Sequence, residues 1–236
     1  MDNEVKEFVE IISHELNDEG VTTSPNEKKA ADELSNVANL SLPEPGLVNY
    51  WRDINNRVLW IDSEITEDII GIVRHIIRWN WEDRDIPVEK RVPIKIYINS
   101  PGGLLIPSMA VCDAILASKT PVYGINMHEA SSAAAFIFIC CHHRMAMPNS
   151  FFLLHLGSGG TCGTFQQSRA QQENYNHEML TLTSVLKTRL GITNEEEFDQ
   201  LIDGEWYLYM DTVDGSKSDA RRFNLITDED PTLFWK

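Results

Sequence analysis

The chain has 236 residues and a hydrophobic content of 42%, so it is long enough to bury one large core. Its 20 Lys and Arg against 36 Asp and Glu give a formal net charge of −16, which argues against binding nucleic acid or an anionic membrane. The longest apolar run, Ala133 to Cys141, is far shorter than the roughly 20 residues that span a bilayer. With four cysteines and no basic leader, we expect reduced thiols and a cytoplasmic location.

Residues 1–45 hold eleven acidic residues and three lysines, a net charge of −8. Apolar residues recur there at helical spacing, which predicts one amphipathic helix. The helix either packs on the chain's own body or a neighbour, or serves as a docking element for a partner. A Leu-Pro-Glu-Pro segment beginning at Leu42 marks a boundary. We therefore expect a partly flexible acidic extension at 1–45 and a folded domain at 46–236.

The next segments alternate between strand and helix patterns. Residues 56–62 predict a strand and residues 66–81 an amphipathic helix with Trp79 and Trp81 as packing residues. The apolar face of that helix is expected to hold Ile69, Ile72, Val73, Ile76 and Ile77. A strand at 94–98, a helix ending near 118 and a strand at 122–126 follow. This order predicts right-handed parallel crossovers, and hence an α/β fold with its site at the strand ends.

The turn after the strand at 94–98 reads YINSPGG (Tyr97 to Gly103). Adjacent glycines permit a positive φ and leave backbone N–H groups open to a ligand near a helix start. The turn is either a cradle for an anion or oxyanion, or an ordinary Pro-Gly-Gly turn.

A second helix is predicted where Ser131 and Ser132 open a wholly apolar run that ends at Cys141. The adjacent cysteines and histidines at 140–143 do not predict a zinc site, because zinc ligands need intervening residues to turn onto one metal. We expect no metal and no cofactor. The plainer interpretation is two buried thiols and a cationic helix end formed by His142, His143 and Arg144.

His155 follows an apolar strand pattern at 151–156. A polar helix from about 165 to 190 comes next; at ~1.5 Å per residue it is ~39 Å long, so we expect it to project and meet another subunit.

These residues permit nucleophilic catalysis. If Ser132 attacks a carbonyl, the oxyanion would form at a helix N-terminus, where the N–H groups of Ala133 and Gly103 could donate to it. His155 is the best candidate for the general base.

YINSPGG, the serine at the head of an Ala-rich helix, and Arg144-x-x-x-Pro-Asn-Ser followed by His155 resemble the ClpP family, the proteolytic subunit of the ATP-dependent Clp protease. The likeness covers roughly Tyr50 to Asp228. It implies an α/β fold of stacked ββα units, shared with the crotonase superfamily, with a projecting handle helix. It also implies a serine endopeptidase with Ser132 as nucleophile, His155 as base, and Gly103 and Ala133 as oxyanion donors.

The resemblance departs from the family pattern at the third triad position. The family's Arg-Asp pair has no clean match, and the nearest equivalent is Gly204-Glu-Trp-Tyr, so Glu205 is the predicted acid and Asp203 the alternative. Both carboxylates could instead be solvated turn residues. Ser131 occupies a position that is usually alanine in the family.

The resemblance further implies self-association into heptameric rings that can stack as a tetradecamer, or mixed rings with a paralogue. An AAA+ unfoldase would deliver unfolded proteins to the chamber. Two other functions stay open: a catalytically inactive ClpP-like structural ring subunit, and a crotonase-type acyl-CoA enzyme.

Overall fold

The computed structural model describes residues 44–157, 160–210 and 219–228. The chain separates into two units, residues 1–52 and 53–236, and helix α3 (Pro45–Asn55) crosses the division. Nearly all of the predicted extension at 1–45 lies outside the described residues, so its helix, its flexibility and its boundary stay predictions. The site and all the contacts below belong to the second unit.

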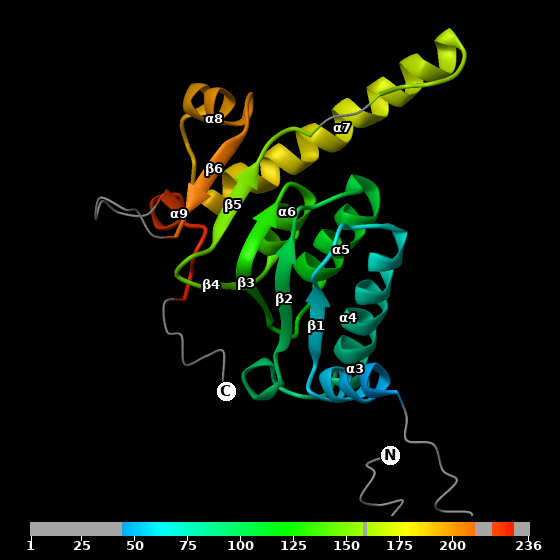
Figure 1. Ribbon diagram of the computed structural model, residues 1–236, viewed down its shortest axis with the longest axis vertical. Helices are drawn as coiled ribbons and strands as arrows, with labels where there is room; N and C mark the ends of the chain where they lie inside the picture. The colour runs from blue at the N-terminus through cyan, green and yellow to red at the C-terminus, as the bar shows by residue number, and fades with distance from the viewer. Residues whose placement is uncertain (1–43, 158–159, 211–218, 229–236) are drawn as a thin grey trace, which may run out of the picture. The chain divides into compact units, whose positions relative to one another are not determined.

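The second unit is built on one six-stranded sheet with the order β1-β2-β3-β5-β6, in which β4 also pairs with β3 (Figure 1). The first five strands pair in parallel, and β6 runs antiparallel to β5. The strands are β1 (Val58–Ile61), β2 (Ile94–Ser100), β3 (Val122–Ser131), β4 (His143–Ala146), β5 (Phe151–Leu154) and β6 (Trp206–Tyr209). The predicted α/β fold is confirmed.

Helices α4, α5 and α6 lie on one face of the sheet (Figure 1). The helices of the second unit are α4 (Ile70–Glu82), α5 (Leu105–Ala117), α6 (Ala133–Cys140), α7 (Phe165–Leu190), α8 (Glu195–Ile202) and α9 (Asp219–Arg222), with single 3-10 turns at Glu67–Ile69 and Val88–Lys90. All eight residues of α6 are buried, because it packs against the sheet, α5 and α7. This agrees with a helix that has no polar face.

The strands alternate between two environments, as a pleated sheet requires. In β2 the side chains of Ile94, Ile96 and Ile98 are fully buried against the helices. The opposite face of the sheet holds a smaller apolar cluster around Ile125 and Met145, which includes Tyr97, Tyr123, Met127 and Met147. Among the described residues, helices α4, α5 and α6 therefore cover one face of the sheet, and this smaller cluster lies on the other.

Helix α4 differs from the predicted pattern on its outer side. Ile72, Ile76 and Trp79 are buried at the i, i+4, i+7 spacing of one stripe. Ile77 is 61% exposed and Trp81 66% exposed, so their prediction as packing residues was wrong. Ile77 follows Ile76 by one residue and Trp81 follows Trp79 by two. Because an α-helix turns about 100° per residue, both side chains point away from the buried stripe.

The C-terminal end of α6 is capped by arginines. The guanidinium groups of Arg144 and of Arg189, on α7, donate hydrogen bonds to carbonyls at this end, those of Ile139, Cys140 and Cys141. His142 Nδ1 instead accepts a hydrogen bond from the Val122 N–H (3.0 Å), and burial, with the Arg189 charge second, lowers its pKa. The predicted cationic role was therefore wrong for His142.

Helix α7 has the predicted bounds, Phe165–Leu190. Thr164 and Gln167 form a capping box at its start, and Gly191 ends it in a left-handed conformation. Its buried residues, Met179, Leu182, Leu186 and Leu190, all lie in its C-terminal half, and the N-terminal half extends beyond the sheet (Figure 1). Within the described ranges, no helix combines the length and apolar character needed to cross a membrane.

Candidate active site

Ser132 lies in the sharp connection between β3 and α6. Its backbone has φ 53° and ψ −125°, a conformation that is uncommon for a residue with a Cβ and carries strain. Its N–H donates to the Leu153 carbonyl (2.8 Å), and its carbonyl accepts from the Phe136 N–H (3.2 Å). These bonds hold Ser132 at the head of α6, where the helix dipole favours negative charge.

Ser131 belongs to the strand rather than to the helix. It is the last residue of β3 and pairs with Leu153 of β5. The prediction that Ser131 opens the helix with Ser132 was wrong, because β3 runs five residues beyond the predicted end at Asn126 to reach β5. The two neighbouring serines therefore lie in different elements and have different partners.

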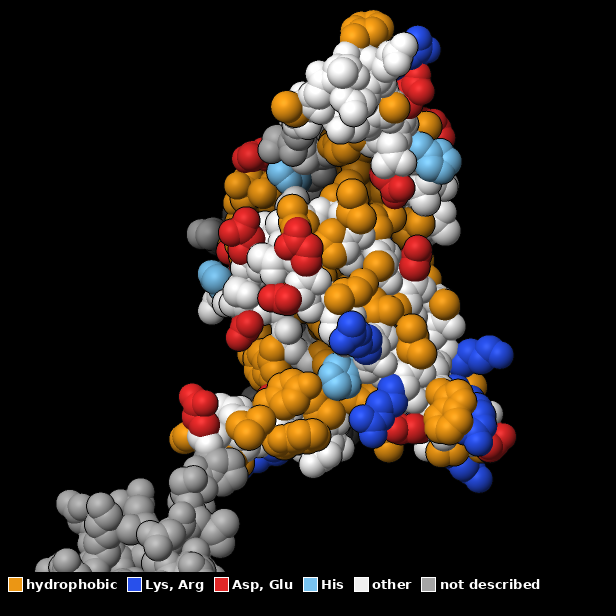
Figure 2. All heavy atoms as spheres, turned by 90° about the vertical axis from the view of Figure 1, so that its right-hand side faces the viewer, with side chains coloured by type: hydrophobic (Ala, Val, Ile, Leu, Met, Phe, Trp, Pro, Cys, Tyr) orange, Lys and Arg blue, Asp and Glu red, His pale blue; other side chains and the backbone are white. Residues whose placement is uncertain are grey.

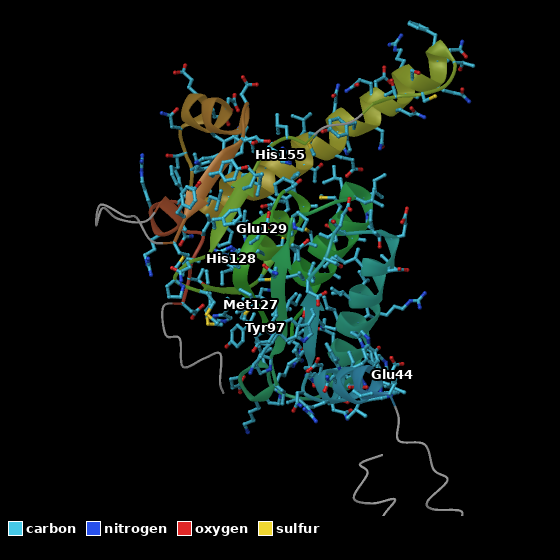
Figure 3. All side chains as sticks on the ribbon, in the orientation of Figure 1. Glu44, Tyr97, Met127, His128, Glu129 and His155 are labelled. Atoms are coloured by element: carbon cyan, nitrogen blue, oxygen red, sulfur yellow. The ribbon has the colours of Figure 1, made fainter. Side chains whose placement is uncertain are left out.

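His155 is the residue directly after β5, and its Nε2 lies 2.8 Å from Ser132 Oγ. Because β3 and β5 are parallel, their carboxyl ends meet at one edge of the sheet, which brings the two side chains together. In Figure 3 the labelled Tyr97, Met127, Glu129 and His155 follow one another along the sheet, with His155 nearest α7. A neutral imidazole with its hydrogen on Nδ1 can accept the Ser132 proton at Nε2.

The glycine turn lies directly against Ser132. A Cβ on Gly102, whose φ is 94°, would stand 2.8 Å from Ser132 Cβ and 3.0 Å from the Ala133 nitrogen. Ser100 supports the turn, since its hydroxyl donates to the Ser63 carbonyl (2.6 Å) and accepts from the Gly102 N–H (3.1 Å). Sequence reasoning missed this role, although a serine before Pro-Gly-Gly was a visible signal.

Two backbone N–H groups near Ser132 are not used by the hydrogen bonds of the neighbouring helix and β-bridge. Ala133 begins α6, so its N–H has no carbonyl within the helix. Gly103 bridges Ile65, but the bridge uses the Gly102 carbonyl (2.7 Å) and the Leu104 N–H (2.9 Å). The bridge therefore does not use the Gly103 N–H.

The two candidate acids lie at different places. The β5–β6 register pairs Leu154 with Trp206, and extending it by one residue sets Glu205 opposite His155 on the same face. Asp203 follows α8, and its N–H donates to the Asp199 carbonyl (3.1 Å). Among the described residues, the Glu205 carboxylate accepts a hydrogen bond from the Tyr207 hydroxyl (3.4 Å) and none from His155.

Asn126 is a second supporting residue that the sequence did not reveal. It lies where β3 changes its neighbour from β4 to β5, and its Nδ2 donates to the Phe151 carbonyl (2.9 Å). Its buried Oδ1 has no partner among the described residues. This hydrogen bond fixes the start of β5, the strand that leads to His155. In the sequence, the only sign of this role was one amide side chain in an otherwise apolar strand.

The fold is that of an α/β protein whose candidate site lies at the carboxyl edge of a parallel sheet, at the head of a buried helix. Residues 51–214, well over half of the chain, match the family model described as Clp protease. The chain belongs to this family, which confirms the resemblance and supports a ClpP-type peptidase.

Two curated relatives match three quarters of this chain. The ATP-dependent Clp protease proteolytic subunit 3 of Parasynechococcus marenigrum (strain WH8102) is 27% identical over 187 residues, which cover 75% of this chain and 86% of the relative. The protein of the same name from Synechococcus sp. (strain CC9605) matches at the same identity and coverage.

Proposed function

We propose that this chain is a serine endopeptidase subunit of a Clp-type protease, with Ser132 as nucleophile and His155 as general base. The observation that carries the proposal is the 2.8 Å contact between Ser132 Oγ and His155 Nε2, at a helix N-terminus and against a glycine turn. Family membership supports the same assignment.

The reaction follows from these positions. His155 Nε2 takes the Ser132 proton as Oγ attacks the peptide carbonyl, and the N–H groups of Gly103 and Ala133 donate to the oxyanion that forms. The imidazolium then protonates the leaving amine, and an acyl-enzyme remains on Ser132. Water, activated by His155, attacks the acyl carbon and releases the second product. No cofactor is needed for these steps.

Glu205 is the proposed third member of the catalytic triad. Its carboxylate would orient His155 by accepting a hydrogen bond from the imidazole Nδ1–H. The β5–β6 register supports Glu205 over Asp203, since only Glu205 continues the ladder opposite His155. In the structure its Oε2 accepts a hydrogen bond from the Tyr207 hydroxyl, and Oε1 is the oxygen that we propose accepts from the imidazole.

The proposed assembly is a ring of such subunits, heptameric and stacked in pairs, or mixed with a paralogue. The relatives' name, proteolytic subunit of an ATP-dependent protease, supports a subunit role and an AAA+ unfoldase as partner, with unfolded proteins as substrates. The half-length of α7 that extends beyond the sheet supports a contact with another subunit. A cytoplasmic location stays a prediction from the sequence.

A fluorophosphonate probe tests the proposal, because it forms a covalent adduct only with an activated serine. We expect one adduct per chain by intact mass, lost in Ser132→Ala and strongly slowed in His155→Gln. Ser131→Ala is the matched control, since it removes the neighbouring hydroxyl and should keep the adduct. An assembled wild-type ring that forms no adduct would contradict the proposal and favour the inactive structural subunit.

A further inference from the structure

The exposed face of the antiparallel β5–β6 pair holds a row of side chains that leads from the candidate site. Alternate residues of the two strands point to this face, and the register pairs Leu153 with Tyr207 and Phe151 with Tyr209. His155 and Glu205 extend the same face by one pair. Tyr207 is therefore the next residue on its strand, on the same side, after Glu205.

The ring of Tyr207 is held by aromatic neighbours. It stacks with Tyr209 at a centroid distance of 6.4 Å and an interplanar angle of 15°, and Phe151 packs against both rings at 6.2 and 6.4 Å. These contacts restrict the position of the ring, and therefore the position of the hydroxyl oxygen that it carries. That hydroxyl donates to Glu205 Oε2 at 3.4 Å.

A second carboxylate nearby is already bound. Glu129 Oε1 accepts a hydrogen bond from Ser131 Oγ (2.8 Å), whereas the Tyr207 hydroxyl donates to Glu205. The Glu205 charge, with smaller effects from burial and Glu129, raises the pKa of Tyr207. At neutral pH the phenol is thus protonated and available as a donor.

We propose that Tyr207 is a positioning residue whose hydroxyl holds the Glu205 carboxylate on the face where His155 lies. This inference rests on the proposed function. A glutamate has one more rotatable bond than an aspartate, and the loss of its rotamer freedom opposes any fixed position. A hydrogen bond to Oε2 fixes part of that freedom and leaves Oε1 free to accept from His155 Nδ1.

The test compares Tyr207→Phe with Tyr209→Phe. Both variants keep the aromatic ring on the same strand face, but only the first removes a donor to Glu205. With a short fluorogenic peptide, we expect kcat of Tyr207→Phe to fall roughly threefold to tenfold, the size of one lost hydrogen bond, with KM unchanged. Tyr209→Phe should keep both constants.

A double-mutant cycle with Glu205→Gln separates positioning from a general structural effect. Glu205→Gln alone should lower kcat by about 10⁴-fold, as loss of an orienting carboxylate does in serine proteases. In that background Tyr207→Phe should have no further effect, because the carboxylate that accepts from His155 is already gone. Additive losses would overturn the inference.

The remaining outcomes are equally decisive. An unchanged or raised kcat in Tyr207→Phe, beside an active wild type, overturns the positioning role alone; a raised kcat would mean that Tyr207 withholds Glu205 from His155. A wild-type chain that neither cleaves the peptide nor reacts with the fluorophosphonate overturns the proposed function and this inference with it.

Discussion

Gly102 controls how closely the glycine turn approaches Ser132. Its φ of 94° disfavours any residue with a Cβ, and that Cβ would lie 2.6 Å from the Ser131 carbonyl oxygen. The atoms it would meet are backbone atoms and the Cβ of Ser132, which have no free rotation with which to yield. An alanine must therefore push the turn, and with it the Gly103 N–H, away from the head of α6.

We expect Gly102→Ala to lower peptide hydrolysis and fluorophosphonate labelling by about 10²-fold, the usual cost of losing one oxyanion donor. Gly71→Ala is the control, since no atom lies within 4 Å of a Cβ built there. Circular dichroism and thermal unfolding would establish that the variant is folded. A folded Gly102→Ala variant with wild-type reactivity would contradict the role given to the turn.

At the level of single residues, the sequence predicted the candidates whose signals are local. Ser132 stands out because it begins an apolar helix, and His155 because it follows an apolar strand. Gly102 and Gly103 identify the turn in which they lie. Glu205 was preferred over Asp203 only through the family resemblance, because the β5–β6 register that sets Glu205 opposite His155 pairs segments about 50 residues apart. The contacts of Ser100 with Ser63 and of Tyr207 with Phe151 also join segments far apart in the sequence.

Three elements meet at a buried ion pair near the amino ends of the strands. Asp83 lies at the end of α4, and Arg57 lies just before β1. The Asp83 carboxylate accepts hydrogen bonds from Arg57 Nη1 (2.6 Å) and Nη2 (2.8 Å). Thr120, before β3, donates to the same carboxylate (2.8 Å). The side chains of Arg57 and Asp83 are 14% and 3% exposed, so removal of one partner leaves a poorly solvated charge.

We expect Asp83→Ala to lower the free energy of unfolding by about 3 kcal/mol, the size seen when a buried pair loses one partner. Glu82→Ala is the matched control. It breaks the exposed pair with Arg78 (2.7 Å), which contributes less than about 1 kcal/mol. Urea unfolding at pH 7 measures both. Equal losses in the two variants would contradict a special role for Asp83.

The same pair predicts a pH dependence. Hydrogen bonding from Arg57 lowers the pKa of Asp83 most, burial opposes it, and Thr120 lowers it further. Because the folded-state pKa lies below the unfolded value, the stabilisation is fully present above about pH 4 and is lost as the pH falls through the folded-state pKa. The difference between wild type and Asp83→Ala should therefore shrink in acid; a difference that grows would contradict the assignment.

At the level of elements, the sequence predicted long periodic segments well and short strand ends poorly. The bounds of α7 follow from a capping residue and a glycine, both readable in the sequence. The end of β3 was placed five residues early, because its last part is fixed by pairing with β5 and not by its own pattern. Arg189 at the end of α6 could not be foreseen, since it comes from a helix 50 residues later.

The described part of the second unit carries two exposed apolar surfaces. The sheet patch consists of Trp60, Tyr97, Tyr123, Met127 and Met147 on the face of the sheet away from the helices. The helix patch consists of Ile70, Ile77 and Trp81 of α4 with Ile106 and Leu116 of α5. Figure 2 shows apolar side chains gathered on the side that carries these helices. Exposed apolar surfaces of this kind mark interaction sites.

The two patches lie on different sides of the second unit, so they cannot cover each other within one chain. A contact between the helix patch of one copy and the sheet patch of the next would bury both, and its repetition gives a ring where the rotation between neighbours closes. This is the kind of contact that the proposed assembly needs. An isologous dimer would instead use one patch twice and leave the other open.

Single substitutions test the two patches separately. Ile77→Lys alters the helix patch and Trp60→Lys the sheet patch; their side chains are 61% and 47% exposed, so the fold should tolerate both changes. Burial of a lysine in the contact should weaken each association by about 10²-fold or more. In sedimentation velocity we expect the wild type as a large oligomer and each variant as single chains. Glu196→Lys, at an exposed position of α8, is the control that should still assemble.

Mixing the two variants decides between head-to-tail and isologous association. Ile77→Lys keeps an intact sheet patch and Trp60→Lys an intact helix patch, so a mixture can form one good contact between unlike chains and no more. We expect a two-chain species in the mixture and in neither variant alone, which native mass spectrometry can identify by its two different masses. A mixture that contains only single chains would contradict head-to-tail contact. Wild-type-sized oligomers in either variant alone would remove that patch from the interface.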